Sequence, residues 1–66
     1  MSNLKRIREE KNITQVKLAE ASGVNFRILQ YYEQGYKDIN KAQAITLQRV
    51  ANALECKIED LLEEVN

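Results

Sequence analysis

Apolar residues recur along this chain at intervals of three and four, the spacing that places them on one face of a helix. The pattern divides the 66 residues into five short helical segments with short connections and no low-complexity linker. These segments run from Asn3 to Lys11, Thr14 to Ala21, just after Asn25 to Gln34, Lys41 or Ala42 to Leu54, and Ile58 to Val65. The sequence therefore predicts a single all-α domain over residues 1–66.

The second and third segments carry the clearest boundary signals. Thr14 and Asn25 have side-chain oxygens that accept hydrogen bonds from the free N–H groups of a first helical turn. Gly23 and Gly35 follow the two segments, at positions where a positive φ favours glycine. Two short helices around a tight corner form the layout of a helix-turn-helix, whose second helix enters the major groove of DNA.

The third predicted helix has two different faces. At about 100° per residue, Leu29, Tyr32 and Glu33 point to one side and can pack on the preceding helices. The opposite side carries an arginine, a glutamine and two aromatic rings, which suit base edges and the thymine methyl group. We therefore expect base contacts from Phe26, Arg27, Gln30 and Tyr31.

Each of these four residues also has a purely structural interpretation. Phe26 could fold back over Val24 or Val16 as plain packing, and Tyr31 could be a second core tyrosine. Arg27 and Gln30 could be ordinary solvated residues. Exposure decides between the alternatives for the aromatic ring, because a phenylalanine left in water on a small protein implies a partner surface.

Candidate phosphate contacts surround the same helix. Phosphates are commonly met by amide and hydroxyl groups, lysines and helix N-termini, which position the protein without reading sequence. Such residues begin the second and third helices and follow the third: Thr14, Gln15, Lys17, Asn25, Lys37 and Lys41. A tolerated surface lysine is the alternative for Lys17, which lies in a first helical turn where a carboxylate would suit the helix dipole better.

Arg8 and Glu33 fall on or beside the apolar faces of their helices. A buried charge is costly unless it is paired. We predict that these two side chains form a structural ion pair that joins the first helix to the end of the third.

The formal net charge of zero argues against a nucleic-acid partner, but the charges are distributed unevenly along the chain. Up to Lys41 the chain has eight basic and five acidic residues, and after it two basic and five acidic residues. The N-terminal two-thirds of the molecule could therefore face phosphate.

Candidate catalytic chemistry is scarce. The chain has no histidine and no glycine-rich phosphate loop, and its single cysteine, Cys56, has no base partner and is expected to pack as a small apolar residue. The acidic residues near the C-terminus are interpreted as a solvated edge: Glu59, Asp60, Glu63 and Glu64. We predict no enzymatic activity, no cofactor, no metal and no small-molecule ligand.

Cysteine usage and hydropathy indicate the compartment. One cysteine excludes an internal disulfide and fits a reducing environment. No apolar run resembles a signal peptide or is long enough to cross a bilayer. We expect a cytoplasmic protein with no membrane partner.

A chain below about 70–80 residues buries a small core, so association with a second copy would be useful. The stripe formed by Leu61, Leu62 and Val65 could exceed what one core needs. We therefore expect a homodimer with this stripe in its interface, whose reading helices would lie about 34 Å apart.

Taken together, these segments resemble the phage-repressor and Cro-like (XRE-type) helix-turn-helix family over nearly the whole chain. The resemblance is carried by Thr14-Gln15, Leu18-Ala19, Gly23-Val24, Tyr32-Glu33-Gln34-Gly35 and Val50-Ala51-Asn52-Ala53-Leu54. It implies a compact five-helix, lambda-repressor-like DNA-binding domain that binds operators as a twofold dimer and commonly represses transcription. It also implies backbone contacts at Gln15 and Asn25, and base contacts at Phe26, Arg27 and Tyr31.

The chain departs from the family pattern in ways that keep a rival hypothesis open. Val16 and Lys17 stand where many members have glutamates, and Phe26 and Ile28 are apolar where polar reading residues are common. An apolar reading face on a molecule of zero net charge would also suit an antitoxin-like or adaptor module that binds a protein. A steep fall of DNA affinity with salt would favour the DNA-binding hypothesis.

Overall fold

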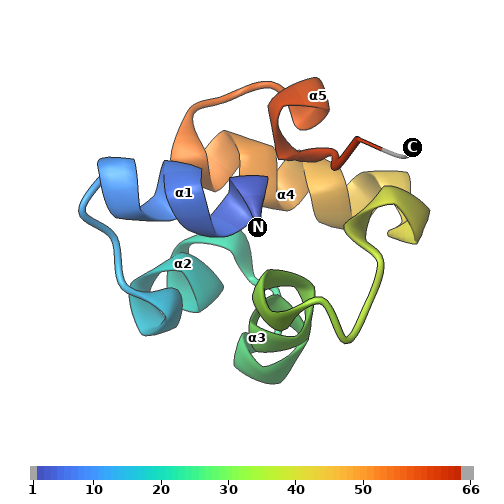
Figure 1. The fold of residues 1–66 in the computed structure, drawn as a ribbon. Coiled ribbons are helices and arrows are strands. Elements are labelled where there is room, and N and C mark those ends of the chain that lie inside the picture. Colours follow the sequence, from blue (N-terminus) through green and yellow to red (C-terminus); the bar gives the residue numbers. More distant parts are fainter. Residues whose placement is uncertain (1, 65–66) are drawn as a thin grey trace.

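The computed structural model describes residues 2–64, which contain five α-helices, one 3-10 turn and no strand (Figure 1). The elements are α1 (Asn3–Glu10), α2 (Gln15–Ser22), α3 (Phe26–Gln34), η1 (Ile39–Lys41), α4 (Ala44–Leu54) and α5 (Ile58–Leu61). The predicted all-α fold, with a helix-turn-helix formed by its second and third helices, is confirmed.

The caps of the helix-turn-helix are those that the sequence predicts. Thr14 Oγ1 accepts the N–H of Lys17 at 3.1 Å, and Asn25 Oδ1 accepts the N–H of Arg27 at 2.8 Å. Gly23 and Gly35 end α2 and α3 with φ angles of 71° and 84°. These local bonds satisfy backbone groups that the helix ends leave free, so the corner between the two helices is specified locally.

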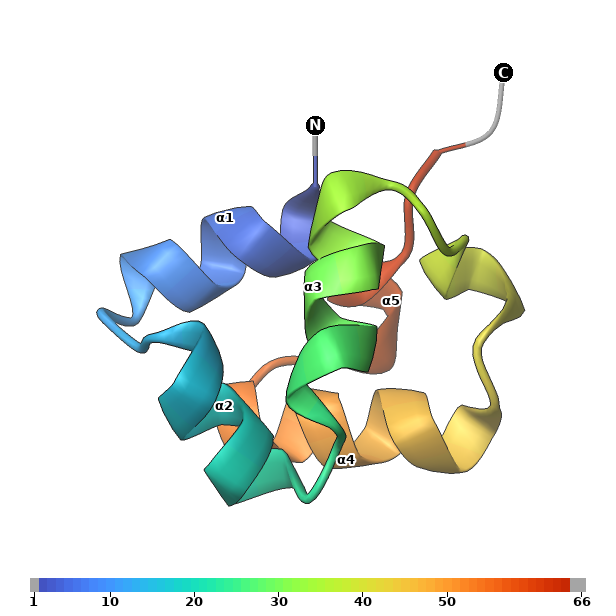
Figure 2. The ribbon, with the colours of Figure 1, turned by 90° about the horizontal axis from the view of Figure 1, so that it is seen from below.

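A core rich in leucine lies between the helices. Helix α2 packs on α3 and α4, while α1 packs on α3 and α5, and α5 also packs on α4. The buried apolar residues come from every element: Leu4, Ile7, Leu18, Leu29, Ile39, Leu47, Val50, Ala51, Leu54 and Leu61. Because α1 and α2 pack against one side of α3, its other side is left for contact with a partner (Figure 2).

Helix α4 begins at Ala44, later than predicted. The chain first forms η1, in which Asp38 Oδ1 accepts the N–H of Asn40 at 2.9 Å, and the two residues before α4 are extended. The turn carries Ile39 into the core, where it is 5% exposed. The expected start of the fourth helix at Lys41 or Ala42 is therefore wrong.

Helix α5 ends at Leu61, and the next residue, Leu62, has an extended backbone. The predicted continuation of this helix through residues 62–64 is therefore wrong, and Val65 lies outside the described residues.

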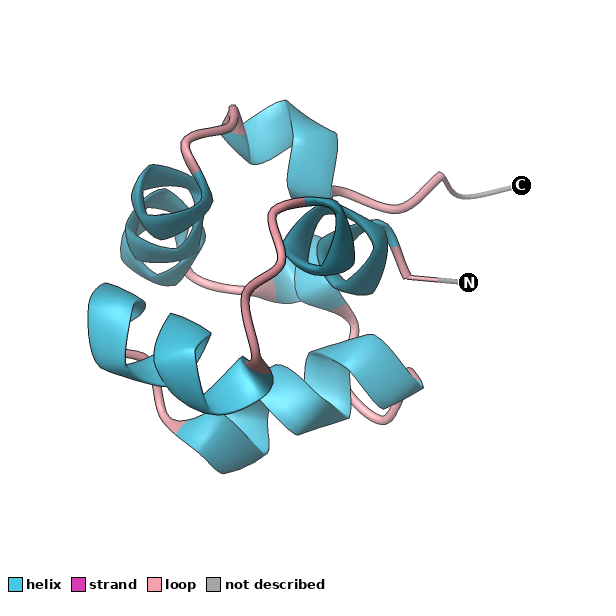
Figure 3. Cartoon of the chain, turned by 90° about the vertical axis from the view of Figure 1, so that its left-hand side faces the viewer, coloured by secondary structure: helices cyan, strands magenta, loops and turns pink. Residues whose placement is uncertain are grey.

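Two asparagine side chains hold the segment that follows α5. Asn40 Nδ2 donates to the carbonyl oxygen of Glu63 at 2.7 Å, and Asn40 Oδ1 accepts the N–H of Glu63 at 2.8 Å. Asn3 Nδ2 donates to the carbonyl oxygen of Leu62, and Glu63 Oε2 accepts the N–H of Asn3, both at 2.8 Å. These bonds replace those of a further helical turn, and they keep both ends of the described chain on one side of the molecule (Figure 3).

The expected dimer stripe needs a correction. Leu61 is 0% exposed and belongs to the core of its own subunit, so it cannot contribute to a dimer interface. Leu62 is half-buried and packs against the same core. Leu61 and Leu62 are therefore used inside the subunit and do not form an excess apolar surface.

Candidate nucleic-acid interface

Helix α3 lies at the edge of the molecule, below the other helices in Figure 1 and nearest the viewer in Figure 2. Leu29 is 0% exposed on its inner side, and Tyr32 packs partly against the core. Phe26 and Arg27 are exposed on the other side. The helix thus turns its apolar residues inward and presents arginine and an aromatic ring to solvent.

Exposure decides between the alternatives for the aromatic residues. Phe26 is 37% exposed, and neither Phe26 nor Tyr31 is among the side chains of residues 2–64 that pack against the core. The interpretation of Tyr31 as a second core tyrosine is therefore wrong. Gln30 and Tyr31 are half-buried, and Arg27 is the most accessible polar candidate on this face.

Arg8 and Glu33 form an ion pair between α1 and the last turn of α3. Arg8 Nε and Nη2 donate to the two carboxylate oxygens of Glu33 at 2.7 and 3.0 Å, and Nη1 donates to the carbonyl oxygen of Ile13 at 2.8 Å. The hydrogen bonds to Glu33 raise the pKa of Arg8 despite its partial burial, so the arginine stays charged. Gln15 Nε2 adds a third donor to Glu33 at 3.0 Å, which ties the start of α2 to the same carboxylate.

The polar residues at the helix starts use their acceptors inside the fold and keep donors for a ligand. Thr14 Oγ1 and Asn25 Oδ1 accept backbone N–H groups, which leaves the Thr14 hydroxyl hydrogen and the Asn25 amide NH₂ group. Gln15 commits one amide hydrogen to Glu33 and keeps the other. Because phosphate oxygens are acceptors, donors at both ends of α3 suit a DNA backbone.

Two lysines follow α3 and border one shallow hollow. Lys37 and Lys41 are exposed, and together with Tyr32 they line a hollow of about 210 Å³. Lys17 differs from these two lysines because it has an acidic neighbour: its Nζ lies 3.7 Å from Glu20 Oε1. Both of these side chains are largely exposed, and a surface contact of this kind contributes little.

The ion pairs show which basic side chains lack an acidic partner. Within residues 2–64 three basic side chains form ion pairs: Arg6 with Glu10, Arg8 with Glu33, and Lys17 with Glu20. Arg27, Lys37 and Lys41 form none with any described residue. A part of the free positive charge therefore lies on α3 and the segment that follows it.

Sequence reasoning missed Tyr36 as a possible site residue. It is 76% exposed, and its ring meets that of Tyr31 edge to face with centroids 6.0 Å apart. The available signal was an aromatic residue directly after the glycine that ends the reading helix, a position that commonly contacts the last helical turn.

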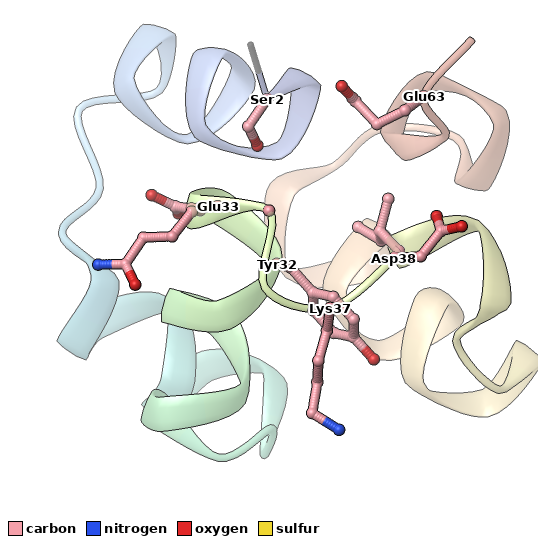
Figure 4. Close-up of a pocket in the computed structure, with 9 residues that line it drawn as sticks. Ser2, Tyr32, Glu33, Lys37, Asp38 and Glu63 are labelled. Carbon is pink, nitrogen blue, oxygen red and sulfur yellow. The ribbon is translucent and has the colours of Figure 1, made fainter. Parts of the chain in front are cut away.

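The hollow in Figure 4 lies between the start of α1, the end of α3 and the segment after α5, with a volume of about 320 Å³. Its carboxylates are already engaged: Glu33 bonds Arg8, Asp38 bonds the N–H of Asn40, and Glu63 bonds the N–H of Asn3. The charged group of this hollow without an ion-pair partner among residues 2–64 is Lys37, which the proposed phosphate contacts already include.

The remaining reactive groups bear on metal binding and nucleophilic chemistry. No cluster of three metal-ligating side chains is found among residues 2–64. Burial raises the pKa of the Cys56 thiol, with Asp60 as a second cause, so the thiol is not an activated nucleophile. No helix within the same residues has the length and apolar character needed to cross a bilayer.

Comparison with known families agrees with this geometry. The helix-turn-helix family model HTH_3 matches residues 4–61, from α1 to the last residue of α5. No curated protein and no solved structure gave a significant match. Because the matched segment covers most of the chain and includes both helices of the motif, the chain belongs to the XRE-type helix-turn-helix family of DNA-binding domains.

Proposed function

We propose that this protein is a small, sequence-specific regulator of transcription that inserts α3 into the major groove of double-stranded DNA. The observation that supports this most is the outward face of α3, where Phe26 and Arg27 are exposed and Arg27 has no acidic partner among residues 2–64. A helix that is packed on one side only and polar or aromatic on the other fits the width of that groove.

Each residue of this face has a role that its chemistry suits. Arg27 would take guanine O6 and N7 together, Gln30 would take adenine N6 and N7, and Phe26 would cover a thymine methyl group. Tyr31 would donate to a base or a phosphate. The backbone contacts would come from Thr14, Gln15, Lys17, Asn25, Lys37 and Lys41.

Repression is the mode of action that we propose, because occupation of an operator blocks other proteins from the same DNA and needs no catalytic step. The family to which the chain belongs is typically non-enzymatic, and we propose no enzymatic activity for this member. We also propose a cytoplasmic location, where such a protein meets its DNA.

Salt dependence tests the proposal. We expect the logarithm of the affinity for a labelled duplex, measured by fluorescence anisotropy, to fall linearly with the logarithm of salt concentration. Lys37→Ala and Lys41→Ala should each reduce the slope by about 0.9, because each removes one neutralised phosphate. Lys57→Ala is the matched control, since this exposed lysine belongs to the connection between α4 and α5, which runs along the top of Figure 1 while α3 lies at the bottom. A salt-independent affinity, or an equal effect of Lys57→Ala, would contradict the proposal.

The second candidate function is a protein-binding module of the antitoxin or adaptor type. Val16 and Phe26 favour it, since they leave α2 and α3 with apolar side chains that are 54% and 37% exposed. This candidate predicts no affinity for any duplex, or an affinity that salt does not change.

We propose that the protein acts as a homodimer, because its core is small. With Leu61 excluded, Ile45 becomes the residue to test: it is 55% exposed at the start of α4, outside the helix-turn-helix. We expect sedimentation velocity to show a dimer that Ile45→Asp converts to monomer, while Val16→Asp on α2 leaves it unchanged. A monomer both alone and on operator DNA would rule out the dimer.

A further inference from the structure

Tyr36 is held in a defined position although most of it lies in water. It follows Gly35, and its N–H donates to the carbonyl oxygen of Tyr31 at 2.9 Å. The two rings meet edge to face, with centroids 6.0 Å apart and planes at 74°. This geometry is favourable for aromatic pairs and places the Tyr36 ring beside the end of the outward face of α3.

The end of the helix explains an apolar side chain at this position but not a tyrosine. When a left-handed residue ends a helix, the residue after it often packs on the last turn, and a phenylalanine would do this equally well. The Tyr36 hydroxyl forms no hydrogen bond with any of residues 2–64. With 76% of the residue exposed, both the ring and the hydroxyl remain available to a partner.

The surroundings of Tyr36 favour the DNA backbone as that partner. Lys37 is the next residue, and Lys37 and Lys41 border the same hollow. Asp38 also lines this hollow, but it accepts the N–H of Asn40 and forms no ion pair with either lysine. Tyr31, on the other side of the ring pair, belongs to the proposed reading face. A phosphate near these lysines would bring its deoxyribose and oxygen atoms to the Tyr36 ring and hydroxyl.

We propose that Tyr36 contacts the DNA backbone at the edge of the major groove, with its ring against a deoxyribose and its hydroxyl donating to a phosphate. The inference rests on the proposed function and adds a residue and a role to it. A neutral backbone contact supports binding to every sequence equally and leaves the salt dependence unchanged, because no counterion is displaced by the hydroxyl.

Fluorine NMR of protein labelled with 3-fluorotyrosine tests the contact directly. The chain has three tyrosines, so three signals are expected, and Tyr36→Phe assigns one of them. We expect the Tyr36 signal, identified by its loss in the Tyr36→Phe variant, to shift on addition of a random-sequence duplex. If anisotropy shows that the duplex binds and the Tyr36 signal does not move, the contact is overturned while the proposed function stands. If no duplex binds at all, both fail.

Affinity provides the second test. We expect Tyr36→Phe to weaken binding about fivefold for selected and random duplexes alike, the effect of one neutral hydrogen bond, with the salt slope unchanged. The variant keeps the ring contact with Tyr31, so its thermal unfolding should match that of the unsubstituted protein. Unchanged affinity would overturn the hydroxyl contact, and a loss confined to the selected sequence would indicate a base contact instead and overturn the backbone assignment.

Discussion

Replacing Arg8 with alanine is expected to lower the free energy of unfolding by about 3–5 kcal/mol, which is comparable with the whole stability of a domain this small. The substitution leaves the Glu33 side chain, which is 3% exposed, without its cation. It also removes the donor that the carbonyl oxygen of Ile13 receives at 2.8 Å. Unfolding by urea, followed by circular dichroism, measures the change.

Arg6→Ala is the matched control for this prediction. Arg6 lies on the same helix and pairs with Glu10, but the two side chains are 50% and 61% exposed. A pair in such contact with water contributes about 0.3–0.5 kcal/mol or less. If Arg8→Ala and Arg6→Ala cost the same, the Arg8–Glu33 pair does not hold α1 to the end of α3.

The double variant Arg27→Ala, Gln30→Ala is expected to lose roughly 30-fold or more in affinity for a selected operator, since each bidentate base contact contributes about 1–3 kcal/mol. Its affinity for random DNA should fall much less, because only one positive charge is removed. The ratio of the affinity for the operator to the affinity for random DNA should therefore decrease strongly. Anisotropy titrations with both duplexes at one salt concentration measure this ratio.

Helix α4 supplies a matched control of the same residue types. Gln48 and Arg49 are both exposed on α4, outside the helix-turn-helix. Gln48→Ala, Arg49→Ala should leave the specificity ratio unchanged, and circular dichroism should show both double variants folded. Equal losses in the two variants would mean that α3 has no special part in binding.

Features that depend on neighbours in the sequence were predicted well. The caps at Thr14 and Asn25 and the glycines after α2 and α3 act within one turn, so residue type alone sets those boundaries. The spacing of Leu29 and Tyr32 also sufficed to orient α3, because an inward stripe on a helix needs only periodicity.

Two features that depend on distant partners were not predicted: the end of α5 and the burial of Leu61 in its own subunit. Helix α5 ends early because Asn40 bonds the backbone of Glu63 and Asn3 bonds Leu62, contacts that span the chain. The same closure buries Leu61, which periodicity alone could not distinguish from an interface residue. A pattern of apolar residues shows which face is buried but not whether it is buried in the same subunit.

The candidate site also contains features that the sequence could predict and features that it could not. Arg8 and Glu33 could be paired from sequence, since each charge lies on an apolar face and needs a partner. The contact of Gln15 with Glu33 required the angle between α2 and α3, and the exposure of Tyr36 required the path of the loop. Neither angle nor path is encoded in residue spacing.

Selection of bound duplexes from a random-sequence pool tests the central claim, that the outward face of α3 reads DNA. We predict enrichment of a twofold-symmetric sequence with half-sites about 34 Å apart, and no enrichment by the Arg27→Ala, Gln30→Ala variant. A pool that stays random with the unsubstituted protein, or the same enriched sequence from the double variant, would contradict the claim.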